Sequence, residues 1–180
     1  MYGILNRKIL CVLAALLLGA SFGVQAETEA GAVDAAAAFE MLKGLAGSWV
    51  ATSAEAEGEV PHTYRVASAG TVVMETMYDG TDHEMINMYH MDGDDLVLTH
   101  YCAGGNQPHM KLDRATATPG KLHFDFTGGT NLDPEKDQHI HAATIVFVDG
   151  DHVESHWIGY QGGEEAGTMK LALARAGDEN

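Results

Sequence analysis

Basic residues are scarce in this chain of 180 residues, and so are cysteines. Ten lysines and arginines stand against 26 acids, which gives a formal net charge of −16. Such a charge repels phosphate backbones and acidic lipid surfaces, so neither nucleic acid nor an anionic membrane is expected as a partner. The two cysteines, Cys11 and Cys102, leave little scope for a disulfide framework.

The chain has a single long apolar run, and it lies near the start. Residues 9–19 follow Arg7 and Lys8 and precede a small-residue pattern that ends at Ala26. This order is typical of a secretory signal peptide, and the run is too short for a mature membrane-spanning helix. We predict cleavage after Ala26, a periplasmic or secreted protein, and no membrane partner once the leader is removed.

Standard catalytic motifs are also missing. The one Gly-x-Ser-x-Gly, at residues 19–23, lies inside the predicted signal peptide, and the chain contains no His-Glu-x-x-His and no phosphate-binding loop. The spacing of His100 and Cys102 places both on one face of a strand, so a Cys–His nucleophile can be drawn. After loss of Cys11 the thiol of Cys102 is alone, and a lone thiol is most often a small buried hydrophobe. We favour that interpretation and predict no catalytic residue.

What the chain does contain is one helical segment followed by many short alternating ones. Asp34 can cap a helix that continues through alanines to Gly44 or Gly47. Beyond Gly47 the apolar period falls from about 3.6 to about 2, as in strands. Strands are predicted at 48–54, 61–67, 71–78, 84–91, 95–102, 109–115, 121–127, 139–148, 152–160 and 168–175.

The gaps between these strands are short and mostly hold Gly, Asp, Pro or Ser, which indicates an antiparallel meander. A closed barrel leaves such a meander without free edges. We therefore predict an all-β fold, an antiparallel up-and-down barrel of about ten strands preceded by one short helix. The expected organisation is a signal peptide at 1–26, a flexible lead-in at 27–33, one barrel domain at 34–176 and a tail at 177–180.

The hairpin at 96–112 shows the alternating pattern most clearly. Leu96, Leu98, His100 and Cys102 share one strand face, and the two leucines make that face the better candidate for the core. His100 and Cys102 are therefore expected to point into the barrel.

Two segments carry a resemblance to known proteins. A short helix leading into Leu45-Ala-Gly-Ser-Trp49, followed by a strand meander, resembles the calycin group, which includes lipocalins, fatty-acid-binding proteins and nitrobindin-like haem barrels. The segment 84–93, with 98–102 and 105–108, resembles uncharacterised secreted bacterial families of unknown function with this barrel. The resemblance implies a calycin-like fold with a pocket, and it brings no established activity.

The same resemblance implies a structural role for Trp49, which would plug the closed end of the barrel beneath the helix. It also argues against haem. Nitrobindin-like proteins have a second glycine after this tryptophan and a haem-ligating histidine late in the chain. Here residues 50–52 are Val-Ala-Thr, and the predicted strand at 168–175 has no histidine. Haem is disfavoured, and no cofactor is predicted.

Our first functional hypothesis is a non-enzymatic, lipocalin-like barrel that holds a small, partly apolar ligand inside. Barrels of about eight or more strands can enclose one small ligand. Polar groups at its floor or mouth would come from His100, Cys102, Asn106 and Gln107. The other expected lining residues are Met74, Met85, Tyr89, Leu98, Phe124, Phe126 and Trp157. A packed structural or partner-binding barrel is an alternative.

The ten histidines support another alternative, a metal-assisted enzyme. The spacing of His139 and His141 can place both rings on one strand face, which is a moderate metal signal. If the pair faces outward, His123 and His156 on flanking strands would complete the site. If the pair faces inward, His100 would complete the site instead. A coordination position left open for water would then suit catalytic zinc.

Methionines offer a third possibility. Met85, Met88 and Met91 lie close to two histidines, and thioether and imidazole ligands suit copper. Strand alternation, however, sends Met88 to the face opposite Met85 and Met91. Core or pocket lining is therefore the favoured role of these methionines.

Overall fold

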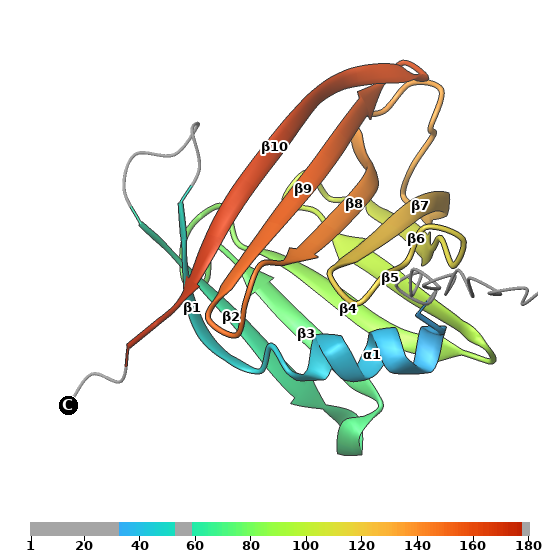
Figure 1. Cartoon of the computed structure of the whole chain (residues 1–180). Coiled ribbons are helices and arrows are strands. Elements are labelled where there is room, and N and C mark those ends of the chain that lie inside the picture. Colours follow the sequence, from blue (N-terminus) through green and yellow to red (C-terminus); the bar gives the residue numbers. More distant parts are fainter. Residues whose placement is uncertain (1–32, 53–58, 178–180) are drawn as a thin grey trace, which may run out of the picture.

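A computed structural model of the chain describes residues 33–52 and 59–177. The predicted signal peptide and most of the lead-in lie outside these residues. In the described part, helix α1 (Ala35–Lys43) precedes ten strands, with one 3-10 turn, η1 (Ser68–Gly70) (Figure 1). The strands are β1 (Gly47–Thr52), β2 (Val60–Ala67), β3 (Val72–Met77), β4 (Met85–Asp92), β5 (Asp95–Tyr101), β6 (Gln107–Leu112), β7 (Lys121–Thr130), β8 (His139–Phe147), β9 (His152–Gln161) and β10 (Glu164–Arg175).

The strands form one closed antiparallel barrel. Each pairs with its neighbours along the chain, and β1 pairs with β10 to close the circle, with Trp49 opposite Arg175. Closure leaves no unpaired sheet edge between the first and last strands. The predicted fold, an all-β barrel preceded by one short helix, is confirmed.

Helix α1 covers one end of the barrel (Figure 1). Its start is capped by the Asp34 carboxylate, which accepts a hydrogen bond of 2.7 Å from the backbone N–H of Ala37. Phe39 and Leu42 point into the core with Ala38, and the helix ends at Gly44. The alanines favour the helix locally, but an isolated helix of nine residues is not stable, so burial of this face holds it in place.

Trp49 and Arg175 together close the barrel at the helix end. The Trp49 indole N–H donates to the backbone carbonyl of Leu45 at 2.8 Å, and the Arg175 guanidinium lies 4.3 Å from the ring centroid. Arg175 also donates to the carbonyls of Gly44, Ala46 and Gly150. Trp49 is thus buried where the structural role was expected, and its cationic neighbour was not anticipated.

The strand boundaries differ from the predictions mainly at two places. β10 begins at Glu164, although its first half is almost entirely exposed and lacks the apolar alternation from which strands were predicted. Pairing with β9 supplies the reason, because backbone hydrogen bonding needs no apolar side chain. β8 carries a bulge opposite β9 between Ile140 and Ala142, which the alternating pattern did not reveal.

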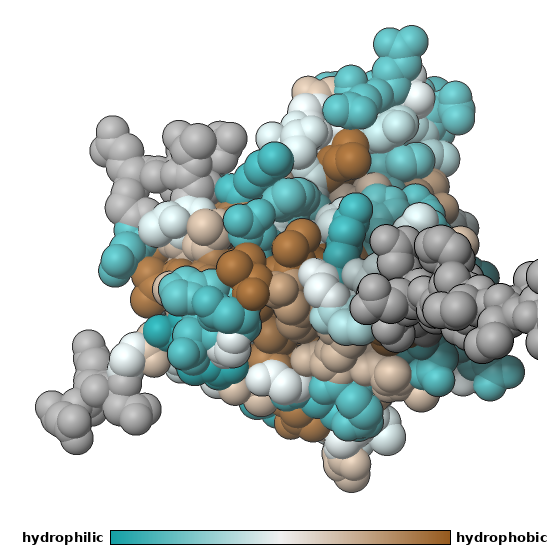
Figure 2. Space-filling view, in the orientation of Figure 1, coloured by the Kyte–Doolittle hydropathy of each residue, from teal (hydrophilic) through white to brown (hydrophobic). Residues whose placement is uncertain are grey.

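The face of the molecule seen in Figure 2 carries many hydrophilic residues. Figure 2 shows hydrophobic residues gathered near the centre of this face, beside the end of β8 and the start of β9, with polar residues around them. Within the residues that the structure describes, no helix has the length and apolar character needed to span a membrane.

Candidate functional site

A row of polar side chains crosses the inside of the barrel. Tyr64 on β2, Glu75 on β3, Asn87 on β4 and His100 on β5 are successive cross-strand partners, so their side chains lie side by side on the inner face. Each of the four is buried. The row therefore places a carboxylate in a region that water does not reach.

Glu75 accepts four hydrogen bonds, two on each oxygen. Oε1 accepts from His62 Nε2 and the Tyr64 hydroxyl, both at 2.7 Å. Oε2 accepts from Asn87 Nδ2 at 2.9 Å and from the Tyr89 hydroxyl at 2.5 Å. A buried ionised carboxylate is costly unless its lone pairs are satisfied, and here they all are.

These contacts also set the ionisation of the cluster. Burial by itself would raise the pKa of Glu75, but the hydrogen bonds from His62, Tyr89 and Tyr64, together with the charge of His62, outweigh it and lower the pKa. Burial, with the adjacent Glu75 charge, raises the pKa of both Tyr64 and Tyr89 well above the ordinary value. Glu75 is therefore a saturated, charged acceptor, which makes it a poor proton acceptor for chemistry.

The network continues from Asn87 to His100, and it fixes the tautomer of the histidine. Asn87 Nδ2 donates to Glu75, so Asn87 Oδ1 is the acceptor that faces His100 Nδ1 at 2.7 Å. Nδ1 must then carry the proton, and Nε2 presents a lone pair. That nitrogen is buried and has no hydrogen-bond partner in the described structure. Burial lowers the pKa of His100 to about 4, so the ring is neutral at pH 7.

Five residues predicted to line an interior ligand cavity do lie inside the barrel. Tyr89, Leu98, His100, Phe124 and Trp157 are each at most 1% exposed. Tyr89 meets Phe124 edge to face with ring centroids 5.7 Å apart, and the His100 and Trp157 centroids are 5.6 Å apart. A void that admits water would expose the side chains around it, so these five residues fill this part of the interior.

Of three other candidate lining residues, Met85 shares the inner face of β4 with Tyr89, whereas Met74 and Gln107 lie elsewhere. Met74 occupies the outer face of β3, where its sulfur is 3.7 Å from the Arg65 guanidinium, because the inner face of that strand carries Val73 and Glu75. Met85 is partly buried against the core. Gln107 donates to the carbonyl of Gly105 and accepts from Thr130, outside any pocket wall described below.

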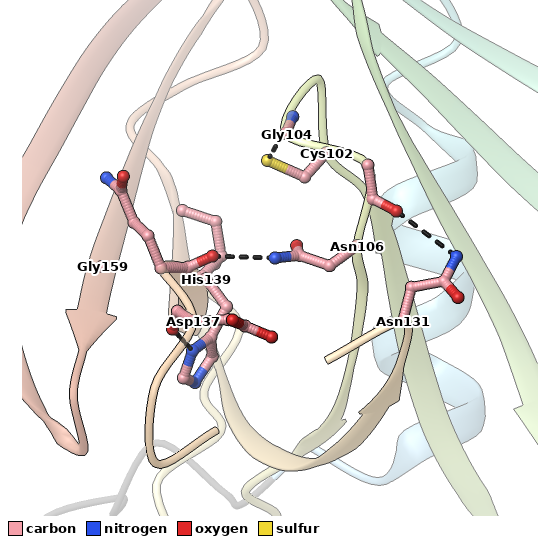
Figure 3. Close-up of a pocket in the computed structure, with 10 residues that line it drawn as sticks. Cys102, Gly104, Asn106, Asn131, Asp137, His139 and Gly159 are labelled. Atoms are coloured by element: carbon pink, nitrogen blue, oxygen red, sulfur yellow. Dashed lines mark hydrogen bonds between the residues drawn. The ribbon is translucent and has the colours of Figure 1, made fainter. Parts of the chain in front are cut away.

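A pocket lies at the mouth of the barrel, in the layer beyond His100 and Trp157 (Figure 3). Cys102 follows the buried His100 by two residues, and Gly159 follows the buried Trp157 by two residues. Both therefore lie one layer nearer the mouth, in the wall of the pocket. The volume is about 570 Å³, which is in the range of small-molecule sites. The remaining lining residues are Gly104, Gly105, Asn106, Asn131, Asp137, Gln138, His139 and Ile140. We call this space the mouth pocket.

Asn106 and Cys102 are the two predicted polar residues that reach the mouth pocket. Figure 3 shows the Asn106 side chain extending across the pocket, where its Nδ2 donates to the carbonyl of Gln138 at 2.8 Å. Asn106 is 6% exposed, and its Oδ1 has no hydrogen-bond partner in the described structure. Cys102 lies just past the end of β5 and is only partly buried, which corrects the expectation of a fully buried thiol.

His139 and His141 do come together, but the bulge in β8 changes the way in which their rings are oriented. His139 Nδ1 donates to the carbonyl of Asp137 at 2.9 Å, and His139 Nε2 lies 3.1 Å from His141 Nδ1. The His141 ring is stacked between Tyr160, at 3.8 Å, and Phe126, at 4.7 Å. Burial and the neighbouring His139 lower the pKa of His141. Phe126, a predicted lining residue, thus packs on the histidine pair.

The other three histidines proposed for a metal site do not join this pair. His123 contacts Thr144 and Asp125 on the outer wall, and His156 contacts Glu154. His100 belongs to the interior row. In the described part of the chain, no group of three or more His, Cys, Asp or Glu side chains could hold a metal ion. β7 and β9 flank β8 as predicted, so the neighbours were right although the ligand set does not form.

Glu75, at the centre of the polar row, was not among the predicted site residues. Glu75 alternates with the buried Val73 and Met77, so an acid on an apolar strand face was a signal available in the sequence. Asn87 alternates in the same way with Met85 and Tyr89, and His62 alternates with Val60 and Tyr64, so both strands carried a similar signal. Which donors would meet Glu75 depended on the register between strands.

Comparison with known proteins adds little to this picture. No family model matches the chain, and no curated protein matches it. Among solved structures, a protein of unknown function from the DUF3598 family of Nostoc punctiforme matches with 11% sequence identity and a TM-score of 0.46. The match covers 75% of this chain and 48% of the other, so the chain spans about half the length of that protein. The likeness concerns the barrel fold alone. The calycin-like resemblance stays a prediction.

Proposed function

We propose that this protein is an exported barrel that binds a small polar molecule in the mouth pocket. The observation that carries the proposal is Asn106, whose buried Oδ1 lacks a hydrogen-bond donor in the wall of a pocket of about 570 Å³. An unsatisfied buried acceptor costs roughly 1–3 kcal/mol. A molecule that brings an N–H or O–H group to Asn106 recovers that cost on binding.

The location differs from our first hypothesis for a physical reason. The interior beneath the pocket is filled by rings and by the hydrogen-bonded row around Glu75, so a ligand there would have to displace fully buried side chains. The mouth pocket needs no such displacement. Its wall is mostly backbone and polar side chains, with Ile140 as an apolar contribution, which favours a polar ligand over a lipid. Export rests on the apolar run and small-residue pattern before Ala26.

A library screen of the folded protein tests the proposal. We would add small polar metabolites to isotope-labelled protein and follow the amide resonances of Asn106, Asn131 and Gln138. A ligand of the mouth pocket should shift these resonances together. Asn106→Leu removes both polar atoms at a similar size and should weaken binding about tenfold or more.

The matched control is Gln107→Leu, the neighbouring amide, which lies outside the pocket wall and should leave affinity within about twofold. A screen in which every bound compound perturbs other surfaces, and none perturbs the pocket amides, contradicts the proposal. That outcome would favour a packed structural barrel, for which the filled interior is sufficient.

A further inference from the structure

The mouth pocket is rich in acceptors and has few donors. Asp137 contributes a carboxylate to the wall, and Asn106 contributes the buried oxygen without a donor. No lysine or arginine lines the pocket. An anionic ligand would therefore meet negative charge without a compensating cation.

His139 does not supply the missing positive group. Its Nδ1–H donates to the carbonyl of Asp137, and its Nε2 shares a single hydrogen bond with His141 Nδ1. Both ring nitrogens are thus used within the protein, and none is left to donate to a ligand in the pocket. Two protonated rings with nitrogens 3.1 Å apart would also repel each other.

The basic side chain nearest in sequence to Asp137 is also engaged. Lys136 forms its ion pair with Asp133 at 2.5 Å, where the Lys136 side chain is 76% exposed and the Asp133 side chain 44%. Asp137 Oδ2 accepts only a backbone N–H, that of Asp133, at 2.8 Å. Among the described side chains, no direct ion pair joins the Asp137 carboxylate to a cation, although its charge, after the hydrogen bond and charge of Asp133, helps to raise the pKa of the nearby Lys136.

Further acids surround the rim. The Glu135 carboxylate lies against Gly163 in the turn between β9 and β10, where an added Cβ would be 3.2 Å from its Oε2. Glu164 and Glu165 follow that turn and are exposed. The loop before β8 and the β9–β10 turn thus meet as one acidic edge on a molecule of net charge −16, which attracts cations by long-range electrostatics.

We infer that the natural occupant of the mouth pocket is a small organic cation, an alkyl ammonium or guanidinium. This inference rests on the proposed function. The cationic N–H groups would donate to the Asp137 carboxylate and to Asn106 Oδ1, and the alkyl chain would lie along Ile140. The acidic edge would draw such a ligand towards the pocket.

Three probes of equal chain length separate charge from shape: putrescine as the cation, butanediol as the neutral analogue and succinate as the anion. For each compound, calorimetry would give the affinity, and the shift of the Asn106 side-chain resonance would show whether it binds in the mouth pocket. Putrescine should bind about tenfold or more tightly than either analogue. Asp137→Asn should weaken putrescine about fivefold to tenfold, and Asn106→Asp, which adds a charged acceptor, should strengthen it.

Asp95→Asn is the matched control, because Asp95 is an exposed carboxylate paired with Lys111 at the helix end of the barrel. It should leave putrescine binding within about twofold. Succinate or butanediol binding as well as putrescine, with shifts at Asn106, overturns the cation inference and leaves the binding function in place. Absence of putrescine binding also overturns the inference, whereas the library screen decides the function separately.

Discussion

Glu75 holds a negative charge at a point that water does not reach, and four donors from the two neighbouring strands, β2 and β4, make this possible. The arrangement has no spare lone pair, so every donor depends on the carboxylate. Removing the charge of Glu75, or one of its two acceptor oxygens, therefore disturbs all four hydrogen bonds. Because the pKa of Glu75 is lowered in the folded protein, its stabilisation is complete above the unfolded value of about 4.5. It is lost as the pH falls through the folded value.

Glu75→Gln should therefore lower the free energy of unfolding at pH 7 by roughly 2–4 kcal/mol. The amide nitrogen would face donors, and Asn87 cannot turn to accept from it without losing His100. Urea unfolding followed by tryptophan fluorescence measures the change. The control Glu154→Gln replaces an exposed acid and should change stability by less than about 0.5 kcal/mol. Equal effects of the two substitutions would contradict this account of the network.

His100 gives the barrel a second pH response, which begins at a higher pH than that of Glu75. The unfolded ring takes up a proton near pH 6.5, whereas the folded ring resists it until about pH 4. Between these values the unfolded state binds more protons, so stability falls as the pH falls. The difference between the two pKa values corresponds to a stability change of at most roughly 3–4 kcal/mol.

His100→Asn keeps a donor near the Nδ1 position and removes the titrating ring. We expect the variant to be less stable at pH 7 but to lose clearly less stability between pH 6.5 and pH 4 than the wild type. Unfolding curves at several pH values give the two slopes. His83→Asn replaces an exposed histidine and should keep the wild-type slope. An unchanged slope in His100→Asn would show that the buried ring is not the source.

At the scale of elements, the end of β10 connects three parts of the chain. Arg175 donates to Gly44 and Ala46 in the connection between α1 and β1, and to Gly150 in the turn between β8 and β9. Its guanidinium also covers Trp49. Gly47 allows this approach, because an added Cβ would lie 3.1 Å from the guanidinium and its φ of +134° disfavours other residues. The closed end is therefore fixed by one side chain as well as by strand pairing.

Arg175→Lys should lower the free energy of unfolding by roughly 1–3 kcal/mol. Lysine keeps the charge, but it has no planar fork with which to reach three carbonyls and cover a ring. Thermal and urea unfolding measure the effect. Arg65→Lys provides the control, since Arg65 is exposed on β2 and contacts the Met74 sulfur. If both substitutions are neutral, the Arg175 contacts do not stabilise the closed end.

At the scale of the whole molecule, charge is unevenly balanced. The sequence has 26 acids and ten basic residues, and the ion pairs formed by lysine side chains lie at exposed positions. Exposed pairs contribute little, so repulsion among the acids dominates the electrostatics of the compact state. The closed barrel gives no way to relieve this repulsion short of unfolding.

Added salt should therefore stabilise the folded protein. Raising sodium chloride from about 0.01 M to about 0.15 M shortens the screening length from about 30 Å to about 8 Å, so distant acids repel one another less. We expect the melting temperature to rise by several degrees and then to level off. Calorimetric scans at constant pH test this. A melting temperature that falls with salt would mean that local ion pairs outweigh the general repulsion.

The sequence by itself determined the helix, the strand positions and the barrel class. Each of these follows from local signals: the Asp34 cap, the alternation of apolar side chains, and turn residues between strands. Local alternation also placed Leu96, Leu98 and His100 inside. Only the tertiary structure decided which inner polar groups meet. Tyr64, Glu75, Asn87 and His100 come from four strands, and their contact depends on register, which side-chain period alone does not specify.

The mouth pocket was likewise decided by the tertiary structure. Asn106 and Cys102 were recognisable as polar residues near a turn, but Asp137 and Gln138 reach them from a loop 30 or so residues away. The bulge at His141 reoriented the histidine pair, because one extra residue breaks the period of two on which the metal-site prediction relied. The alternation of side chains can be read along a single strand. Barrel closure, strand register and bulges depend on contacts between strands, and these contacts form the candidate site.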